Sequence, residues 1–350
     1  NKPSLMLRIR RVPGRAWVWC RNRYRGPIHM FQRFAQSFWH RRSLNIVQDN
    51  THRVGKNDIL LFATLRNEVV RMPFFLNYYR SLGVKHFFLV DNGSTDGFRA
   101  LVANDVDVSV WHTEASYSDS NFGMHWMNAL LRRYGCEHWC VTCDPDEFLV
   151  YPRCDERNLS ELAEFLESEH RRSLCCLMLD MYSDKPVSET RYVAGQDPFE
   201  TAPYFDGSGY TQVDGFLGDV YTRGGVRRRV FFNDYPEAAT ALSKTPFVKW
   251  RWTYSYFMSM HQLVPPWLNV PHDPYHPSPT GCVMHFKYFS ILGEKAREEM
   301  GRGEHWNDSF EYKRYHNMLE EADKPLIYEG SVRYRDWRQL AEKGFLSLGQ

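Results

Sequence analysis

The chain has 350 residues, of which 43% are hydrophobic and 25% are charged. This composition supplies a substantial core and excludes an intrinsically disordered protein. The 44 basic and 42 acidic residues leave a net charge of only +2, but residues 1–55 hold twelve basic residues and a single acid, Asp49. The remainder of the chain is therefore acidic overall.

The basic segment over residues 1–55 predicts an amphipathic N-terminal arm. Aromatic residues recur at helical spacing between positions 31 and 38, with arginines beside them. The residues of this pattern are Phe31, Phe34, Phe38, Arg33, Arg41 and Arg42. Such a mixture is typical of a helix in a membrane interface, so peripheral membrane contact through residues 1–55 is one expectation. A helix packed on the main domain and a solvated leader are the alternatives.

Cysteine usage and hydropathy indicate a cytoplasmic protein. No apolar run approaches the ~20 residues of a membrane-spanning helix. The eight cysteines are too sparse for a disulfide scaffold, and we expect buried, reduced thiols. Cys140 and Cys143 have the spacing of metal ligands, but in a predicted strand this offset places them on opposite faces of the sheet.

From residue 58 onward, short apolar runs alternate with helical segments. The predicted strands are 58–65, 84–91, 106–111, 137–143 and 173–182, and the predicted helices are 71–82, 98–104, 121–134 and 158–170. This alternation predicts an α/β fold with a mainly parallel sheet flanked by helices. The last strand is apolar on both faces and should be central. Residues 183–290 are rich in glycine, proline and aromatics, and residues 291–350 return to charged, helical sequence.

Polar residues follow three of the predicted strands. The first strand runs into Arg66-Asn67-Glu68, the second ends at Asp91, and the fourth runs into residues 144–147. Because ligand sites in parallel sheets lie beyond the carboxyl ends of the strands, we expect these segments to meet at one edge.

The segment Asp144-Pro145-Asp146 is the strongest of these signals. In an extended chain, residues two apart point the same way, and Pro145 favours an extended conformation at Asp144. Two carboxylates facing one spot suit a hard divalent cation. A solvated Asp-Pro turn is the alternative.

Asp91 begins a tight turn, Asp-Asn-Gly-Ser-Thr-Asp-Gly, that leads into a helix. Its side chain can cap backbone amides of that turn, which is a sufficient structural role. The functional alternative is that Asp91 accepts a hydrogen bond from a nucleobase.

Taken together, three motifs resemble glycosyltransferase family 2. They are Leu-Arg-Asn-Glu68, Val-Asp-Asn-Gly-Ser-Thr-Asp96 and Asp-Pro-Asp-Glu-Phe-Leu149. They come at the ends of the first, second and fourth predicted strands, in the order in which that family has them. The likeness is to a bacterial subgroup with an Asp-x-Asp-Glu-Phe-Leu motif and covers about residues 58–290. It implies a GT-A fold and inverting transfer from a nucleotide-sugar.

The resemblance also implies roles for individual residues. Glu68 and Asp91, with Arg66 beside them, would contact the nucleotide-sugar. Asp144 would reach the ribose or a metal-bound water, and Asp146 would ligate Mn²⁺ or Mg²⁺ on the diphosphate. The cation offsets charge that develops on the leaving diphosphate.

Further candidates lie in the second half of the chain. His285 is a plausible third metal ligand and His261 a weaker one, although a lone histidine is often a structural hydrogen bonder. Arg227 and Arg229 could clamp the diphosphate, and a solvated basic hairpin is the alternative reading.

The general base that an inverting transfer requires is not singled out by the sequence. Several acids follow the metal motif. Asp206 and Asp219 are the preferred candidates because they lie in segments rich in glycine and aromatics.

These features predict an inverting, metal-dependent glycosyltransferase of bacterial surface polysaccharide or glycolipid synthesis. The expected partners are a UDP- or GDP-sugar and a glycan or lipid-linked acceptor, and we expect no nucleic acid. The expected organisation is an arm (1–55), a nucleotide-sugar-binding half (56–182), an acceptor-binding and catalytic half (183–290) and a helical extension (291–350). The arm would allow a position on the cytoplasmic face of the inner membrane. The alternatives are a sugar-nucleotidyltransferase and an inactive carbohydrate-binding protein.

Overall fold

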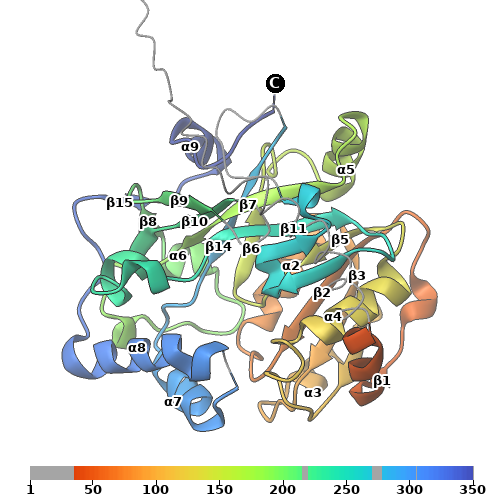
Figure 1. Ribbon diagram of the computed structural model, residues 1–350, viewed down its shortest axis with the longest axis horizontal. Helices are drawn as coiled ribbons and strands as arrows, with labels where there is room; N and C mark the ends of the chain where they lie inside the picture. The colour runs from red at the N-terminus through yellow and green to blue at the C-terminus, as the bar shows by residue number, and fades with distance from the viewer. Residues whose placement is uncertain (1–34, 215–219, 270–277, 305, 350) are drawn as a thin grey trace, which may run out of the picture.

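The computed structural model describes residues 35–214, 220–269, 278–304 and 306–349. A nine-stranded sheet runs through this part of the molecule, with helices packed against it (Figure 1). In spatial order its strands are β1 (Asn45–Gln48), β4 (Val108–His112), β3 (Val84–Asp91), β2 (Ile59–Leu65), β5 (Trp139–Thr142), β11 (Ser243–Lys249), β7 (Ser173–Asp180), β14 (Gly281–His285) and β6 (Glu147–Val150).

The sheet is mixed but mostly parallel. Strands β4, β3, β2, β5, β7 and β14 run in one direction, whereas β1, β11 and β6 run in the other. The predicted α/β class is therefore confirmed, and each of the five predicted strands is present within about two residues. Two interior strands, β11 and β14, come from the region in which the sequence pattern loosens.

Helices and small sheets complete the fold. The helices are α2 (Met72–Ser81), α3 (Phe98–Val102), α4 (Met124–Leu130), α5 (Leu159–Ser168), α6 (Pro198–Thr201), α7 (Leu292–Arg302), α8 (Trp306–Ala322) and α9 (Trp337–Glu342). The remaining strands form the pairs β9 (Thr211–Asp214) with β10 (Val220–Arg223), β12 (Ser255–Met258) with β13 (Gln262–Val264), and β8 (Tyr204–Asp206) with β15 (Ser331–Arg333). The helix predicted over 121–134 begins only at Met124, because residues 121–123 all have positive φ.

Alternate side chains of a strand are buried on opposite faces of the sheet. In β2, Leu61 and Ala63 pack in the cluster that contains α2, α5 and α9, whereas Leu60 and Phe62 pack in the cluster that contains α4. This follows from the period of two in a strand, and burying one such side chain stabilises the fold by about 1.5–3 kcal/mol. Cys140 and Cys143 fall in opposite clusters, as the offset of three predicts.

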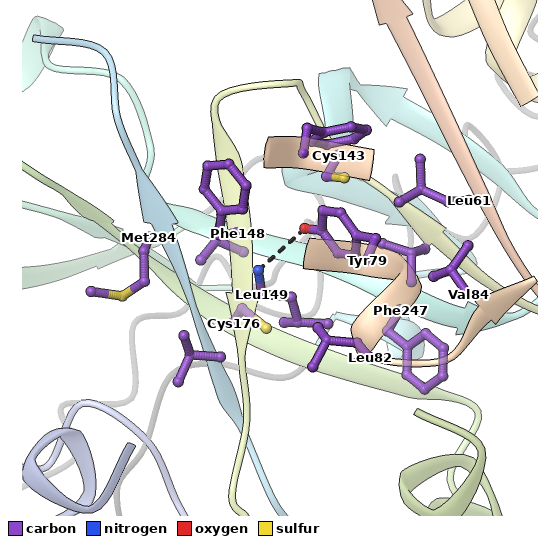
Figure 2. Close-up of a cluster of buried hydrophobic side chains, with 14 of the residues drawn as sticks. Leu61, Tyr79, Leu82, Val84, Cys143, Phe148, Leu149, Cys176, Phe247 and Met284 are labelled. Atoms are coloured by element: carbon purple, nitrogen blue, oxygen red, sulfur yellow. Dashed lines mark hydrogen bonds between the residues drawn. The ribbon is translucent and has the colours of Figure 1, made fainter. Parts of the chain in front are cut away.

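Tyr79 on α2 anchors the edge strand β6. Figure 2 shows its ring within the core beside Phe148 and Leu149. The Tyr79 hydroxyl donates to the Glu147 carbonyl oxygen at 2.9 Å and accepts from the Leu149 amide at 3.2 Å. This pair of bonds fixes the start of β6, and with it the acidic segment that precedes this strand.

The N-terminal segment differs from the expected arm. Residues 45–48 form β1, an edge strand paired antiparallel with β4, so the segment joins the sheet before residue 55. Residues 35–40 are helical, and Phe31 and Phe34 lie outside the described residues. Within the described ranges, no helix has the length and apolar character that crossing a membrane would require.

Candidate functional site

A cavity of about 740 Å³ opens at the carboxyl edge of the parallel strands. It is lined by residues that follow β2, β3 and β5, which the structure brings together as the sequence predicts. The ends of β7 and β14 add Met178 and His285, and the antiparallel strand β11 contributes Lys244 from its start. A smaller cavity of about 480 Å³ shares Arg66, Asn92 and Arg302 with it.

The acidic segment after β5 is a turn, so the extended conformation predicted for it is wrong and the alternative, an Asp-Pro turn, is the conformation found. The Glu147 amide donates to the Asp144 carbonyl oxygen at 3.0 Å, which closes the turn. The reason is that β6 reverses the chain immediately, pairing antiparallel with β14. The turn still leaves Asp144 and Asp146 on the cavity wall, and it directs the side chain of Glu147 inward, where it is buried.

Asp146, Glu147 and His285 form a compact group of metal-type ligands. Each offers one ligand atom, and these atoms lie within 4.8 Å of one another. The expected set contained Asp144 in place of Glu147. Asp144 lies instead near Lys244, with its carboxylate 3.6 Å from Nζ, and Lys244 also forms an ion pair with Glu147.

His285 is oriented by a buried carboxylate. Parallel pairing of β14 with β7 places His285 beside Asp180, and their Nδ1 and Oδ1 atoms are 2.6 Å apart. Asp180 also accepts from Arg227 Nη2 at 2.8 Å and from Nε at 3.1 Å. The opposite ring nitrogen, Nε2, therefore faces Asp146 Oδ2 at 3.4 Å.

The pKa values of this group depend on two factors, the burial of each side chain and the charges of its neighbours. Burial lowers the pKa of His285, but Asp146 and Asp180 outweigh it and raise that pKa to about 9. Burial raises the pKa of Asp180, but Arg227 and His285 bring it down to about 2. Burial and Glu147 raise the pKa of Asp144 to about 7, although water still reaches 41% of its side chain. The imidazole thus bridges two carboxylates.

The donor set fits a divalent cation. A histidine that donates Nδ1–H to a carboxylate binds a metal through Nε2, which is the usual arrangement of a ligating histidine, and the metal would displace the Nε2 proton of His285. Two carboxylates and one imidazole suit Mn²⁺ and are compatible with Mg²⁺. Asp146, Glu147 and His285 would hold the ion, and Asp180 would orient the ring.

The charges on the cavity wall balance. Seven basic residues line it, namely Arg66, Arg223, Arg227, Lys244, Lys287, Lys295 and Arg302. Seven acidic residues line it as well, namely Glu68, Asp144, Asp146, Glu147, Glu237, Glu299 and Glu311. Many of these charges pair with one another, as Lys295 does with Glu68 and Lys287 does with Glu311 at 3.2 Å. With His285 neutral, as it must be to bind a metal, the wall therefore has little net charge of its own.

Helix α7 closes one side of the cavity. Arg66 Nε lies 3.1 Å from Glu298 of α7, and Arg66 Nη1 donates to the carbonyl oxygens of Asn92 and Gly93. Glu68 is buried between Arg71 and Lys295. The two β2-end residues expected to contact a nucleotide-sugar thus line the cavity, and both carry protein partners.

Three expected site residues, Asp91, Asp206 and Arg229, line neither cavity. Asp91 is fully buried and accepts from the Ser94 amide at 2.8 Å and from Arg99 Nε at 2.7 Å, and it lines neither cavity. Asp206 accepts from both Arg229 Nε and Nη2 at 2.9 Å, and this pair also lies off the cavity wall. Asp219 falls outside the described residues.

The weaker histidine candidate lines the cavity but is not part of the metal-type group. The Nδ1 atom of His261 is 2.9 Å from the Ser243 carbonyl oxygen, and burial lowers the pKa of His261 to about 3. We therefore assign it a structural role.

Sequence reasoning missed Glu147, Asp180 and Lys244 as members of the site. Asp180 had two signals, its position near the end of the fifth predicted strand and its place among the acids that follow the metal motif, where it was a candidate base. Lys244 had none, because nothing in its segment predicted a strand.

Comparison with known proteins adds no relative: no family model and no curated protein matches this chain.

Proposed function

We propose that this protein is an inverting, metal-dependent glycosyltransferase that adopts the GT-A form of the α/β fold. It would move a sugar from a UDP- or GDP-sugar to a glycan or lipid-linked acceptor. The observation that carries the proposal is the Asp146–Glu147–His285 group, which faces a cavity of about 740 Å³ at the carboxyl edge of a mostly parallel sheet. Sites for nucleotides in α/β proteins lie at this edge.

The size and lining of the cavity support a ligand as large as a nucleotide-sugar. Its volume falls within the range of about 300–1,000 Å³ that is typical of small-molecule sites. Aromatic side chains of Tyr117, Phe122, Phe257 and Tyr312 offer flat surfaces for a base or a sugar ring. The adjoining cavity near Asn92 gives room for a second part of the donor.

The balanced charges of the wall favour dependence on a metal. A diphosphate approaching equal numbers of basic and acidic groups gains little net attraction. A divalent cation held by Asp146, Glu147 and His285 would supply the missing positive charge and stabilise the leaving diphosphate. Buried Lys244 neutralises Glu147, which keeps this carboxylate group from repelling the donor.

The chain's own groups would bind and orient the donor. Arg66 holds the loop after β3 through its bonds to the Asn92 and Gly93 carbonyl oxygens, and so fixes the cavity rim. The Thr64 hydroxyl is a buried group on the wall without a hydrogen-bond partner among the described residues, and a bound ligand would satisfy it.

A sugar-nucleotidyltransferase is the alternative enzyme. Such an enzyme is expected to wrap a glycine-rich loop around the phosphates after the first strand. Here that loop is Arg66-Asn67-Glu68, and all three side chains are held by neighbours, with Asn67 donating to Glu298. The geometry therefore favours transfer of a sugar over transfer of a nucleotide.

A thermal-shift screen tests the proposal. Wild-type protein is mixed with UDP- and GDP-sugars, with and without Mn²⁺, and the hits are assayed for release of the nucleoside diphosphate. A donor at about 100 times its Kd should add about 2.7 kcal/mol of stability, and only when Mn²⁺ is present. Asp146→Ala should lose both the shift and the activity, whereas Asp234→Ala, which removes an aspartate whose side chain is 65% exposed, should keep both.

Three outcomes count against the proposal. Full activity of Asp146→Ala after treatment with a chelator would exclude the metal assignment. Nucleotide-sugar binding without any release of nucleoside diphosphate, with all acceptors tested, would favour the inactive carbohydrate-binding protein. Release of inorganic pyrophosphate from a nucleoside triphosphate and a sugar phosphate would identify a nucleotidyltransferase.

A further inference from the structure

Large hydrophobic side chains are exposed in the first described segment of the chain. Phe38 is 43% exposed, Trp39 63%, Ile46 44% and Val47 49%. Among the described residues, four of the thirteen exposed large hydrophobic side chains thus fall within ten positions of the sequence. With the exposed cations Arg41 and Arg42 between them, these residues are called the N-terminal patch below.

The N-terminal patch is fixed to the folded domain. His40 stacks on His125 of α4 with ring centroids 4.8 Å apart, and Trp126 Nε1 donates to Ser43 Oγ at 3.1 Å. On its other side, β1 is paired with β4. Figure 1 shows this segment at the outer edge of the sheet, beside α4. The exposed side chains are therefore presented by a rigid support.

Cations and aromatic rings share the surface of the patch. The Arg41 guanidinium carbon lies 3.8 Å from the centroid of the Phe38 ring, and that of Arg42 lies 4.4 Å from the centroid of the Trp39 ring. At the surface of a bilayer, aromatic rings favour the depth of the headgroups, and guanidinium groups pair with phosphates. The patch presents both kinds of group together.

We propose that the N-terminal patch binds the surface of an anionic membrane. The charge of the preceding segment indicates an anionic binding partner. Residues 1–34, which lead into the patch, contain nine basic residues and no acidic one. An anionic bilayer attracts such a segment, while burial of Phe38 and Trp39 removes apolar surface from water. A second copy of the chain is disfavoured, because pairing two β1 edges would bring two arginine-rich segments together. Nucleic acid would give Ile46 and Val47 no apolar layer in which to bury.

This inference does not depend on the reaction proposed above. It concerns a different surface, and vesicle binding is measured without any donor. If both hold, the protein works at a membrane, where a lipid-linked acceptor would be found.

Co-sedimentation with vesicles tests the inference on the full chain. Wild type should bind vesicles that contain phosphatidylglycerol, more weakly at high salt, and should not bind vesicles of phosphatidylcholine alone. The double variants Phe38→Ala/Trp39→Ala and Arg41→Glu/Arg42→Glu should each weaken binding roughly tenfold or more. The matched control is Trp252→Ala/Trp267→Ala, which removes two tryptophans that are 65% and 61% exposed elsewhere, and it should bind as wild type does.

The inference is overturned if the Phe38→Ala/Trp39→Ala protein binds vesicles as tightly as the wild type does. The unfolding midpoint of the variant shows whether it is folded. Vesicle binding would then belong to residues 1–34 or be absent. Two other outcomes also overturn it. In the first, the protein is a dimer in solution, the patch variants abolish the dimer, and no protein binds vesicles. In the second, a short RNA binds through the patch more tightly than vesicles do.

Discussion

Replacement of Asp180 by asparagine should weaken Mn²⁺ binding although Asp180 is not itself a proposed ligand. Its side chain is 1% exposed and accepts from His285 Nδ1 at 2.6 Å and from Arg227 at 2.8 and 3.1 Å. Asparagine keeps the shape and one acceptor oxygen. Its amide group, however, is a donor that must face either Arg227 or His285, and both of these are donors at the contact.

The size of the effect follows from these contacts. Removing a carboxylate partner of a ligating histidine lowers metal affinity by about 10–100-fold, or about 1.4–2.7 kcal/mol. Arg227 would lose its charged partner at Asp180 but keep Glu311 at 3.7 Å and one oxygen of the asparagine, so the loss of folding stability should be about 1.5–3 kcal/mol. Both changes should appear together in Asp180→Asn, so the assay must separate them.

Calorimetric titration with Mn²⁺ measures the affinity, and unfolding in urea measures the stability. Asp206→Asn is the matched control, because Asp206 is equally buried, accepts from Arg229 at two atoms and accepts from the Tyr182 hydroxyl at 2.6 Å. It should lose comparable stability and keep its Mn²⁺ affinity. Unchanged Mn²⁺ affinity in a folded Asp180→Asn protein would refute the assignment of His285 as a ligand. An equal loss in Asp206→Asn would show that the effect is general destabilisation.

Three further predictions concern residues outside the metal-type group. Asp91→Asn should cost about 1.5–3 kcal/mol of stability, because it removes the charge that faces Arg99, and should leave nucleotide affinity unchanged in calorimetry; a selective loss of affinity would restore Asp91 as a nucleoside contact. Burial lowers the pKa of His86, so the unfolded state binds more protons below about pH 6.5 and stability falls as the pH drops. Urea unfolding of His86→Asn across this range should show a shallower pH slope than wild type, and an identical slope would contradict the reasoning. Gly281→Ala should destabilise by about 1–3 kcal/mol in the same assay, since a Cβ there would lie 2.8 Å from the Val150 carbonyl oxygen, and unchanged stability would mean that β14 shifts freely.

The sequence by itself determined strands β2, β3, β4, β5 and β7 and the edge at which the polar residues gather. Each of these strands is a short apolar run bounded by turn or cap residues. Such a run can be recognised in the sequence without knowing which strands it pairs with. The order of strand, helix and strand then places Arg66, Asn92 and Asp144 at one edge, since parallel strands end on the same side.

Only the tertiary structure decided which side chains meet there. His285 and Asp180 are 105 residues apart, and parallel pairing of β14 with β7 is what aligns them. Lys244 reaches Glu147 because β11 inserts antiparallel between β5 and β7, although its segment carries no strand pattern of its own. The turn at Asp144 is likewise imposed from outside, by the pairing of β6 with β14 and by the bonds from Tyr79. The physical reason is that local periodicity reports the burial of one element, whereas the partners of a buried charge are set by contacts between distant elements.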